Sequence, residues 1–116
     1  MMLPDQEPDL TQIFDLLHRL GITANYNGYF YVAYAVHLAI EQPKRLLLIT
    51  KWLYGDVAEH YGTNWKAVER SIRTVLEIAW QANAALLSEL AGYPLREKPR
   101  PASFLAILAA QFTHAA

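Results

Sequence analysis

The stretch that decides the fold is Val57-Ala58-Glu59-His60-Tyr61-Gly62, followed six residues later by Val68. This spacing is typical of a helix-turn-helix, in which two helices cross closely and need a small residue at the crossing, here Ala58. Four residues further on the chain reverses, most easily with a positive φ, which Gly62 adopts without steric cost. Apolar side chains are then expected to close the wedge between the two helices: Val57, Tyr61 and Val68.

The second helix of this motif, expected over residues 64–82, has two unlike faces. Apolar residues recur every three or four positions, as a core-facing stripe requires: Val68, Ile72, Val75, Leu76, Ala79 and Trp80. The opposite face is polar and consists of Lys66, Glu69, Arg70, Arg73, Thr74 and Glu77. Thr63 or Asn64 is expected to cap the start of the helix.

Helical periodicity continues on both sides of the motif, and no stretch alternates apolar and polar residues for long enough to indicate a strand. We therefore expect an all-α fold, a compact bundle of about six to seven helices. The other helices are expected over residues 9–20, 26–41, 44–54, 56–61, 83–90 and 102–114. Residues 1–9 are expected to form a short acidic tail, and residues 10–116 a single helical domain.

Composition excludes several classes of protein. Of the 116 residues, 53% are hydrophobic and 18% charged, which excludes a disordered chain. No apolar run is long enough to span a bilayer and the start is not a signal peptide, so a cytoplasmic protein is expected. Cysteine is absent, which excludes disulfides and thiolate metal sites. The histidines have no metal-ligand spacing and no serine has a nucleophile context, so neither a metal, nor a cofactor, nor an enzyme activity is expected.

The formal net charge of −1 at first argues against a nucleic-acid partner. The charge is uneven, however. Residues 1–43 hold one basic and five acidic residues, a net charge of −4, whereas residues 44–73 hold six basic and three acidic residues, a net charge of +3. The basic region coincides with the helix-turn-helix. Taken alone, this basic charge has an alternative explanation: a solvent-exposed face that is basic by chance.

The polar face of the 64–82 helix has the chemistry of major-groove recognition. Arg can donate two hydrogen bonds to O6 and N7 of guanine, and Glu can accept one from N4 of cytosine. Lys66, together with the main-chain N–H groups and hydroxyl of Thr63 and Asn64, is better placed for phosphates. The alternative is a solvated helix in which Glu69 pairs with Arg73 four residues later.

Two further features have a DNA interpretation beside a structural one. Trp65, at the start of the same helix, is expected to be exposed and to touch the sugar-phosphate backbone. Arg96, Lys98 and Arg100 form a basic loop that either reaches phosphates or is simply solvated.

Several blocks of the sequence, in order, resemble the C-terminal DNA-binding effector domain of the sporulation initiation master response regulator, the stage 0 sporulation protein A family. The resemblance covers nearly all of residues 10–112 and rests on the segments 28–31, 49–54 with 56–58, 68–73 with 77–80, 92–93 and 98–99 with Phe104. It implies a sequence-specific transcriptional regulator that reads short TGTCGAA-like boxes in double-stranded DNA as tandem subunits, hence a homodimer on tandem sites. It also implies that Glu69, Arg70 and Arg73 read bases, with Thr63, Asn64 and Lys66 at the DNA surface. Thr74 shares the helix face of these residues and is expected at the rim of the DNA contact.

A second hypothesis keeps the fold and changes the function. In it, the chain is a helical protein-interaction module that contacts RNA polymerase sigma factor or a partner regulator without specific DNA binding. The presence of Glu69, Arg70 and Arg73 in register favours the DNA reader, because an interaction module has no need of that pattern.

Overall fold

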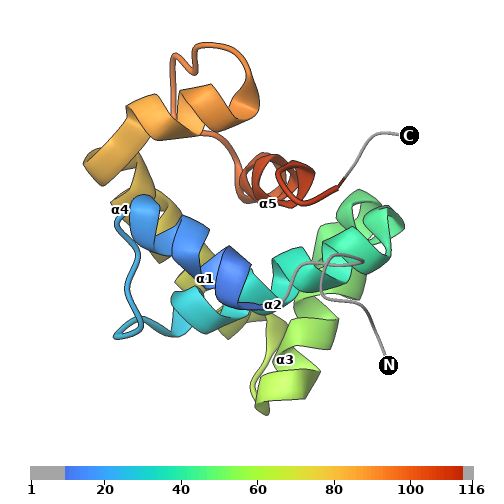
Figure 1. The fold of residues 1–116 in the computed structure, drawn as a ribbon. Coiled ribbons are helices and arrows are strands. Elements are labelled where there is room, and N and C mark those ends of the chain that lie inside the picture. The colour runs from blue at the N-terminus through green and yellow to red at the C-terminus, as the bar shows by residue number, and fades with distance from the viewer. Residues whose placement is uncertain (1–9, 114–116) are drawn as a thin grey trace.

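The computed structural model describes residues 10–113, most of which lie in five α-helices (Figure 1). They are α1 (Leu10–Arg19), α2 (Asn27–Glu41), α3 (Gly55–Tyr61), α4 (Trp65–Ala91) and α5 (Pro101–Ala110). A short 3-10 helix, η1 (Pro43–Leu48), and a π-helix, η2 (Ile49–Tyr54), connect α2 to α3. The all-α fold class expected from the sequence is confirmed.

Helix α2 lies at the centre of the bundle, where it packs against α1, α4 and α5. Its buried residues cover a broad part of its circumference, as expected of a helix that several other helices contact: Tyr29, Val32, Ala33, Ala35, Val36, Leu38 and Ala39. The core is completed by fully buried side chains from the other elements, among them Ile13, Leu17, Tyr54, Ile72, Leu76 and Phe104. No polar or charged residue among residues 10–113 is buried.

The described chain has fewer α-helices than the six to seven expected, and one reason lies at Asn83. The helices expected over residues 64–82 and 83–90 form one element, α4, with a kink at Asn83 (φ −157°, ψ 60°). The Asn83 side chain accepts a hydrogen bond from the main-chain N–H of Leu86 (3.2 Å) and donates one to the carbonyl of Arg19 (3.2 Å). Asn83 therefore caps the second half of α4 from inside the kink.

The expectation of one short helix over residues 44–54 was wrong. The segment divides at Leu48, whose backbone (φ −129°, ψ 66°) is not helical, into the 3-10 helix η1 and the π-helix η2. Leu53 and Tyr54 are buried, but Leu47 is 79% exposed and Trp52 43% exposed. Leu46 and Ile49 are partly buried against the core, so buried and exposed apolar residues are mixed along the segment and do not form the single stripe of a regular helix.

Glycine ends α1 as the sequence predicts, since Gly21 has a positive φ of +87°. The expected acidic tail, the Asp9 start of the first helix and the last three residues lie outside the described part of the chain. Within residues 10–113, no helix is both long and apolar enough to cross a membrane.

Candidate nucleic-acid interface

A tight turn joins α3 to α4, and its residues behave much as the spacing predicts. Gly62 adopts a left-handed conformation (φ +69°), and the N–H of Thr63 donates to the carbonyl of Ala58 at 2.9 Å. Asn64 caps α4 by accepting a hydrogen bond from the main-chain N–H of Ala67 at 2.9 Å. The Thr63 N–H expected at a phosphate is thus already occupied within the turn, and only its hydroxyl is left for a ligand.

The crossing of α3 and α4 is closed by small and branched apolar residues. Ala58 is 4% exposed, and Val57 and Val68 are fully buried. Tyr61, expected in the same wedge, is 39% exposed and turns toward α2 instead. Its hydroxyl donates to the carbonyl of Phe30 at 3.5 Å and its ring lies 5.2 Å from that of Tyr31. The wedge is therefore formed without Tyr61.

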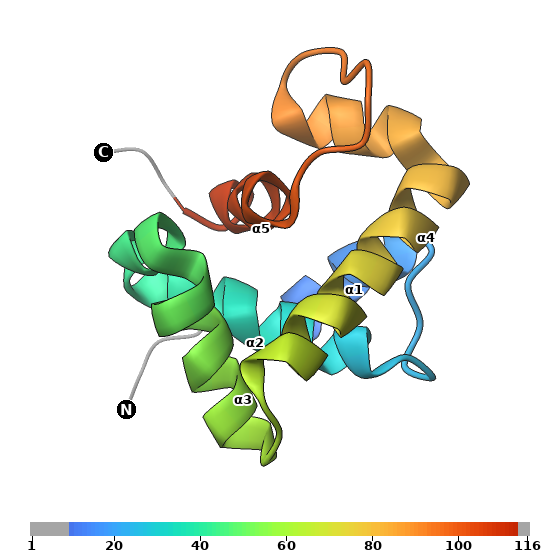
Figure 2. The same cartoon turned by 180° about the vertical axis from the view of Figure 1, so that it is seen from behind.

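The exposed face of α4 carries the side chains that the sequence singled out. The helix runs in front of α1 in Figure 2, with α3 beside its start. Lys66, Arg70, Arg73 and Thr74 are exposed, and Glu69 is partly exposed. The other face of α4 is buried at Val68, Ile72, Val75, Leu76 and Ala79. Because the buried face anchors α4 in the core, the polar side chains on its other face project from a rigid helix.

The charged side chains on this face differ in the partners that they already have within the protein. Arg73 lies 3.8 Å from Glu69, one helical turn before it, and its side chain is 61% exposed. Arg70 makes no ion pair with any residue of the described chain. Lys66 lies 5.7 Å from the ring centre of Trp65, which is 40% exposed. The Glu69–Arg73 pair expected of a solvated helix does form, while Arg70 stays open to a ligand.

Tyr54 lies under this face, because η2 packs against α4. Burial, together with the negative charge of Glu69, raises the pKa of its hydroxyl to about 12, although the positive charge of Arg73 acts to lower it. The tyrosine is therefore neutral at physiological pH and acts as an apolar support beneath Glu69 and Arg73.

Lys98 comes to the edge of the same face from the loop between α4 and α5. Its ammonium pairs with Glu77 of α4, with Nζ 2.5 Å from Oε1. Together with Tyr26, from the turn before α2, these residues line a hollow beside Arg70 and Arg73. The sequence pattern singled out neither Tyr26 nor the Glu77–Lys98 pair, because both depend on segments far apart in the chain.

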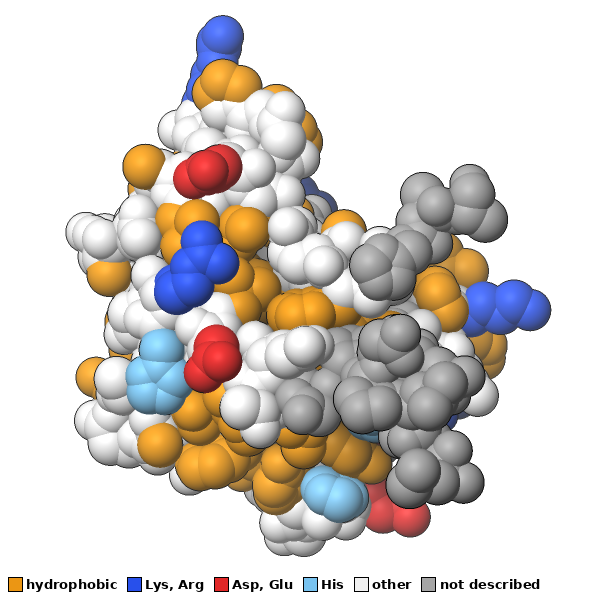
Figure 3. Space-filling view, in the orientation of Figure 1, with side chains coloured by type: hydrophobic (Ala, Val, Ile, Leu, Met, Phe, Trp, Pro, Cys, Tyr) orange, Lys and Arg blue, Asp and Glu red, His pale blue; other side chains and the backbone are white. Residues whose placement is uncertain are grey.

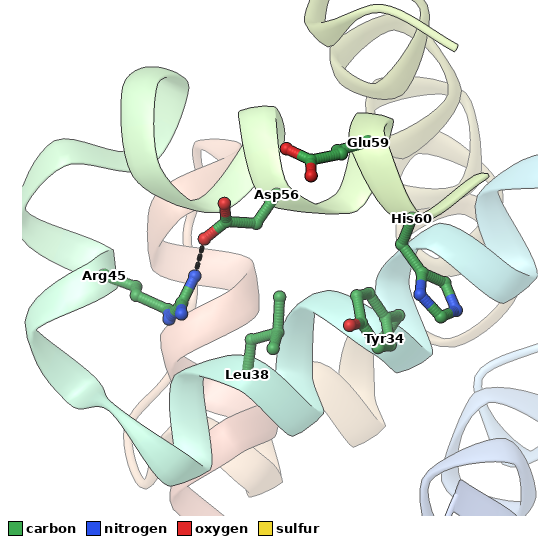
Figure 4. A pocket seen from close by; sticks show the side chains of 6 residues that line it. All are labelled: Tyr34, Leu38, Arg45, Asp56, Glu59 and His60. Atoms are coloured by element: carbon green, nitrogen blue, oxygen red, sulfur yellow. Dashed lines mark ion pairs between the residues drawn. The ribbon is translucent and has the colours of Figure 1, made fainter. Parts of the chain in front are cut away.

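A different hollow lies between α2, η1 and α3 and is lined by Tyr34, Leu38, Arg45, Asp56, Glu59 and His60 (Figure 4). Arg45 forms an ion pair with Asp56 across it, and the ring of His60 stacks on Tyr34 with centroids 4.0 Å apart. Two carboxylates at its rim would repel phosphate, so this hollow does not extend the basic face of α4. The contacts across this hollow hold α3 against α2 and η1.

The face that Figure 3 views is unlike the exposed face of α4. Its visible Lys and Arg side chains lie singly, separated by hydrophobic and uncharged groups, and do not gather into a patch. Arg70 and Arg73, in contrast, lie one helical turn apart on the exposed face of α4.

Comparison with known families shows what kind of domain carries this face. The family described as sporulation initiation factor Spo0A, C terminal, matches residues 13–112. The chain belongs to the Spo0A C-terminal family. The match begins within α1 and runs through the residues that follow α5, so it includes most of α1 and all of the later elements.

Membership of the Spo0A C-terminal family makes the chain a DNA-binding domain of a sporulation regulator. The family is a regulatory one and not an enzyme family. Among residues 10–113, no three His, Asp or Glu side chains are grouped as metal ligands. Family membership thus shows DNA binding for the domain as a whole.

Proposed function

We propose that this domain reads short boxes of the TGTCGAA type by placing α4 in the major groove, with α3, the Gly62 turn and α4 acting as a helix-turn-helix. The observation that carries the proposal is the pair of unlike faces of α4. One face is buried in the core, and the other presents Arg70 and Arg73 on consecutive turns. An α-helix fits the major groove, and its exposed face then meets base edges.

Three side chains are assigned to the bases in this proposal. Arg70 and Arg73 are matched to guanine, to which Arg donates two hydrogen bonds, and Glu69 is matched to the N4 amino group of cytosine. The 3.8 Å pair between Glu69 and Arg73 holds both side chains over the same part of the helix before DNA arrives. Both must exchange this contact for base contacts, whereas Arg70 makes no such exchange.

The start of α4 is assigned to the DNA backbone. The hydroxyl of Thr63, the amide NH₂ of Asn64 and the ammonium of Lys66 are donors suited to phosphate, and the indole of Trp65 covers the neighbouring sugar. Thr74 lies at the rim, where its hydroxyl donates to the carbonyl of Arg70 at 3.0 Å and its oxygen can still accept. These contacts set the register of the helix and carry no sequence preference themselves.

The test is a salt titration of binding to two duplexes of equal length, one with the TGTCGAA box and one with the same bases scrambled. Specific readers bind their sites roughly 10³-fold or more tightly than other sequences. A clear preference for the box at every salt concentration supports the proposal. Equal and weak binding to both duplexes would overturn it and would favour a protein-interaction role.

A further inference from the structure

Glu77 lies on the exposed face of α4, one helical turn beyond Arg73, and both oxygens of its carboxylate are occupied. Oε1 lies 2.5 Å from Nζ of Lys98, and Oε2 accepts a hydrogen bond from the side chain of Gln81 at 2.9 Å. Lys98 is 21 residues away in the chain, in the loop before α5. The carboxylate therefore holds a loop cation against the recognition face.

This pair lies within the proposed interface and not apart from it. Glu77 and Lys98 line the same hollow as Arg70 and Arg73. Their side chains are 45% and 43% exposed, so both charges are open to solvent and to a duplex lying along α4. A phosphate that approached this end of the helix would meet the Glu77 carboxylate beside the Lys98 ammonium.

The charges at this end of α4 act in opposite directions on DNA. A lysine that contacts a phosphate releases a counterion and strengthens binding to any sequence, whereas a carboxylate near the phosphates weakens it. The hydrogen bonds from Lys98 and Gln81 lower the pKa of Glu77, so this carboxylate stays ionised at neutral pH.

We propose that Glu77 is a specificity-determining residue that limits sequence-independent binding, because it holds the Lys98 ammonium and presents its own negative charge to the duplex. Without phosphate contacts from this end of α4, affinity depends more on the base contacts of Arg70 and Arg73. The inference rests on the proposed function, since it assumes that α4 lies in the groove. It makes Glu77 a positioning residue that acts through Lys98.

The test compares Glu77→Gln, Lys98→Met and the double variant on the box and scrambled duplexes over a range of salt. Glu89→Gln is the matched control, because it removes one negative charge from an exposed position in the second half of α4. We expect Glu77→Gln to steepen the plot of log K against log salt by about 0.9, the value for one phosphate contact. At about 0.1 M salt this equals a gain of roughly three- to tenfold in affinity for the scrambled duplex.

The other variants distinguish an effect of Glu77 on DNA binding from a purely structural role in anchoring the loop. Lys98→Met alone is expected to leave the salt dependence unchanged, and the double variant is expected to return to the wild-type slope. Identical results for Glu77→Gln and Glu89→Gln would overturn the proposal. So would a shallower slope for Lys98→Met, because Lys98 would then already contact a phosphate. If the wild-type protein does not prefer the box, the proposed function itself is contradicted, and the inference about Glu77 fails with it.

Discussion

The backbone of Gly28, in the first turn of α2, lies directly against Ser71 in the middle of α4. A Cβ atom at Gly28 would lie 2.4 Å from the carbonyl oxygen of Ser71 and 2.7 Å from a methyl group of Val75. Two helices can approach this closely only where one of them lacks a side chain. The central helix of the bundle thus supports the middle of α4, next to Thr74, which lines a hollow together with Gly28 and Ser71.

Gly28→Ala is expected to destabilise the fold, because backbone atoms must move to make room for the methyl group. Overpacking of this kind costs about 1–3 kcal/mol, which chemical denaturation measures as a lower midpoint. Gly55→Ala is the matched control: Gly55 has helical φ/ψ, and a Cβ there would meet its nearest neighbour, the carbonyl of Thr50, at 4.0 Å. The control is expected to be neutral or stabilising by up to about 1 kcal/mol. Equal effects of the two changes would contradict the close approach.

Asn64→Ala is expected to lower the free energy of unfolding by about 0.5–2 kcal/mol, because the N–H of Ala67 loses its capping partner. Thermal or urea unfolding measures the loss. Asn64→Ser retains an oxygen that can cap and should recover most of the stability. If serine were as poor as alanine, the capping bond would not be the source of the effect.

The high pKa of Tyr54 predicts how stability changes in alkali. The folded-state pKa is about 12 and the ordinary value is 10.0, so folding favours the protonated hydroxyl. The contribution of this group is fully present below pH 10 and is lost as the pH rises from about 10 to 12. Tyr54→Phe cannot ionise, and we expect its stability to fall less steeply over that range. Tyrosinate absorbance should show that the variant lacks one of the latest tyrosines to titrate.

Lys66→Ala is expected to weaken binding to the box and scrambled duplexes by the same factor. The slope of log K against log salt should become shallower by about 0.9, the loss of one phosphate contact. Fluorescence anisotropy over a range of salt measures both quantities. A loss confined to the box would instead place Lys66 at a base edge.

The local features of the fold could be predicted from the sequence, because single residues determine them. Gly62 alone permits the left-handed turn, and Asn64 is one of two neighbouring residues able to cap the helix after it. The alternation of apolar and polar positions likewise gave the buried and exposed faces of α4. Family membership confirms DNA binding, and the roles of Glu69, Arg70 and Arg73 remain the proposal to be tested.

The features that the sequence did not reveal depend on contacts between distant segments. The Glu77–Lys98 pair joins residues 21 positions apart, and nothing in the local pattern marks them as partners. Leu48 interrupts the segment before α3 although its neighbours are apolar, because half of that segment faces solvent. Tyr61 fits the expected spacing but finds aromatic partners on α2, so its ring leaves the wedge.

The central claim, that Arg70 reads a guanine from the exposed face of α4, is tested most directly by a double-mutant cycle. Wild type and Arg70→Ala are titrated with box duplexes in which each guanine in turn is replaced by 7-deazaguanine, which pairs normally but lacks the N7 acceptor. We predict one position at which the replacement weakens wild-type binding by about 1 kcal/mol or more and has little further effect on Arg70→Ala. Equal losses in both proteins at every guanine would contradict the account.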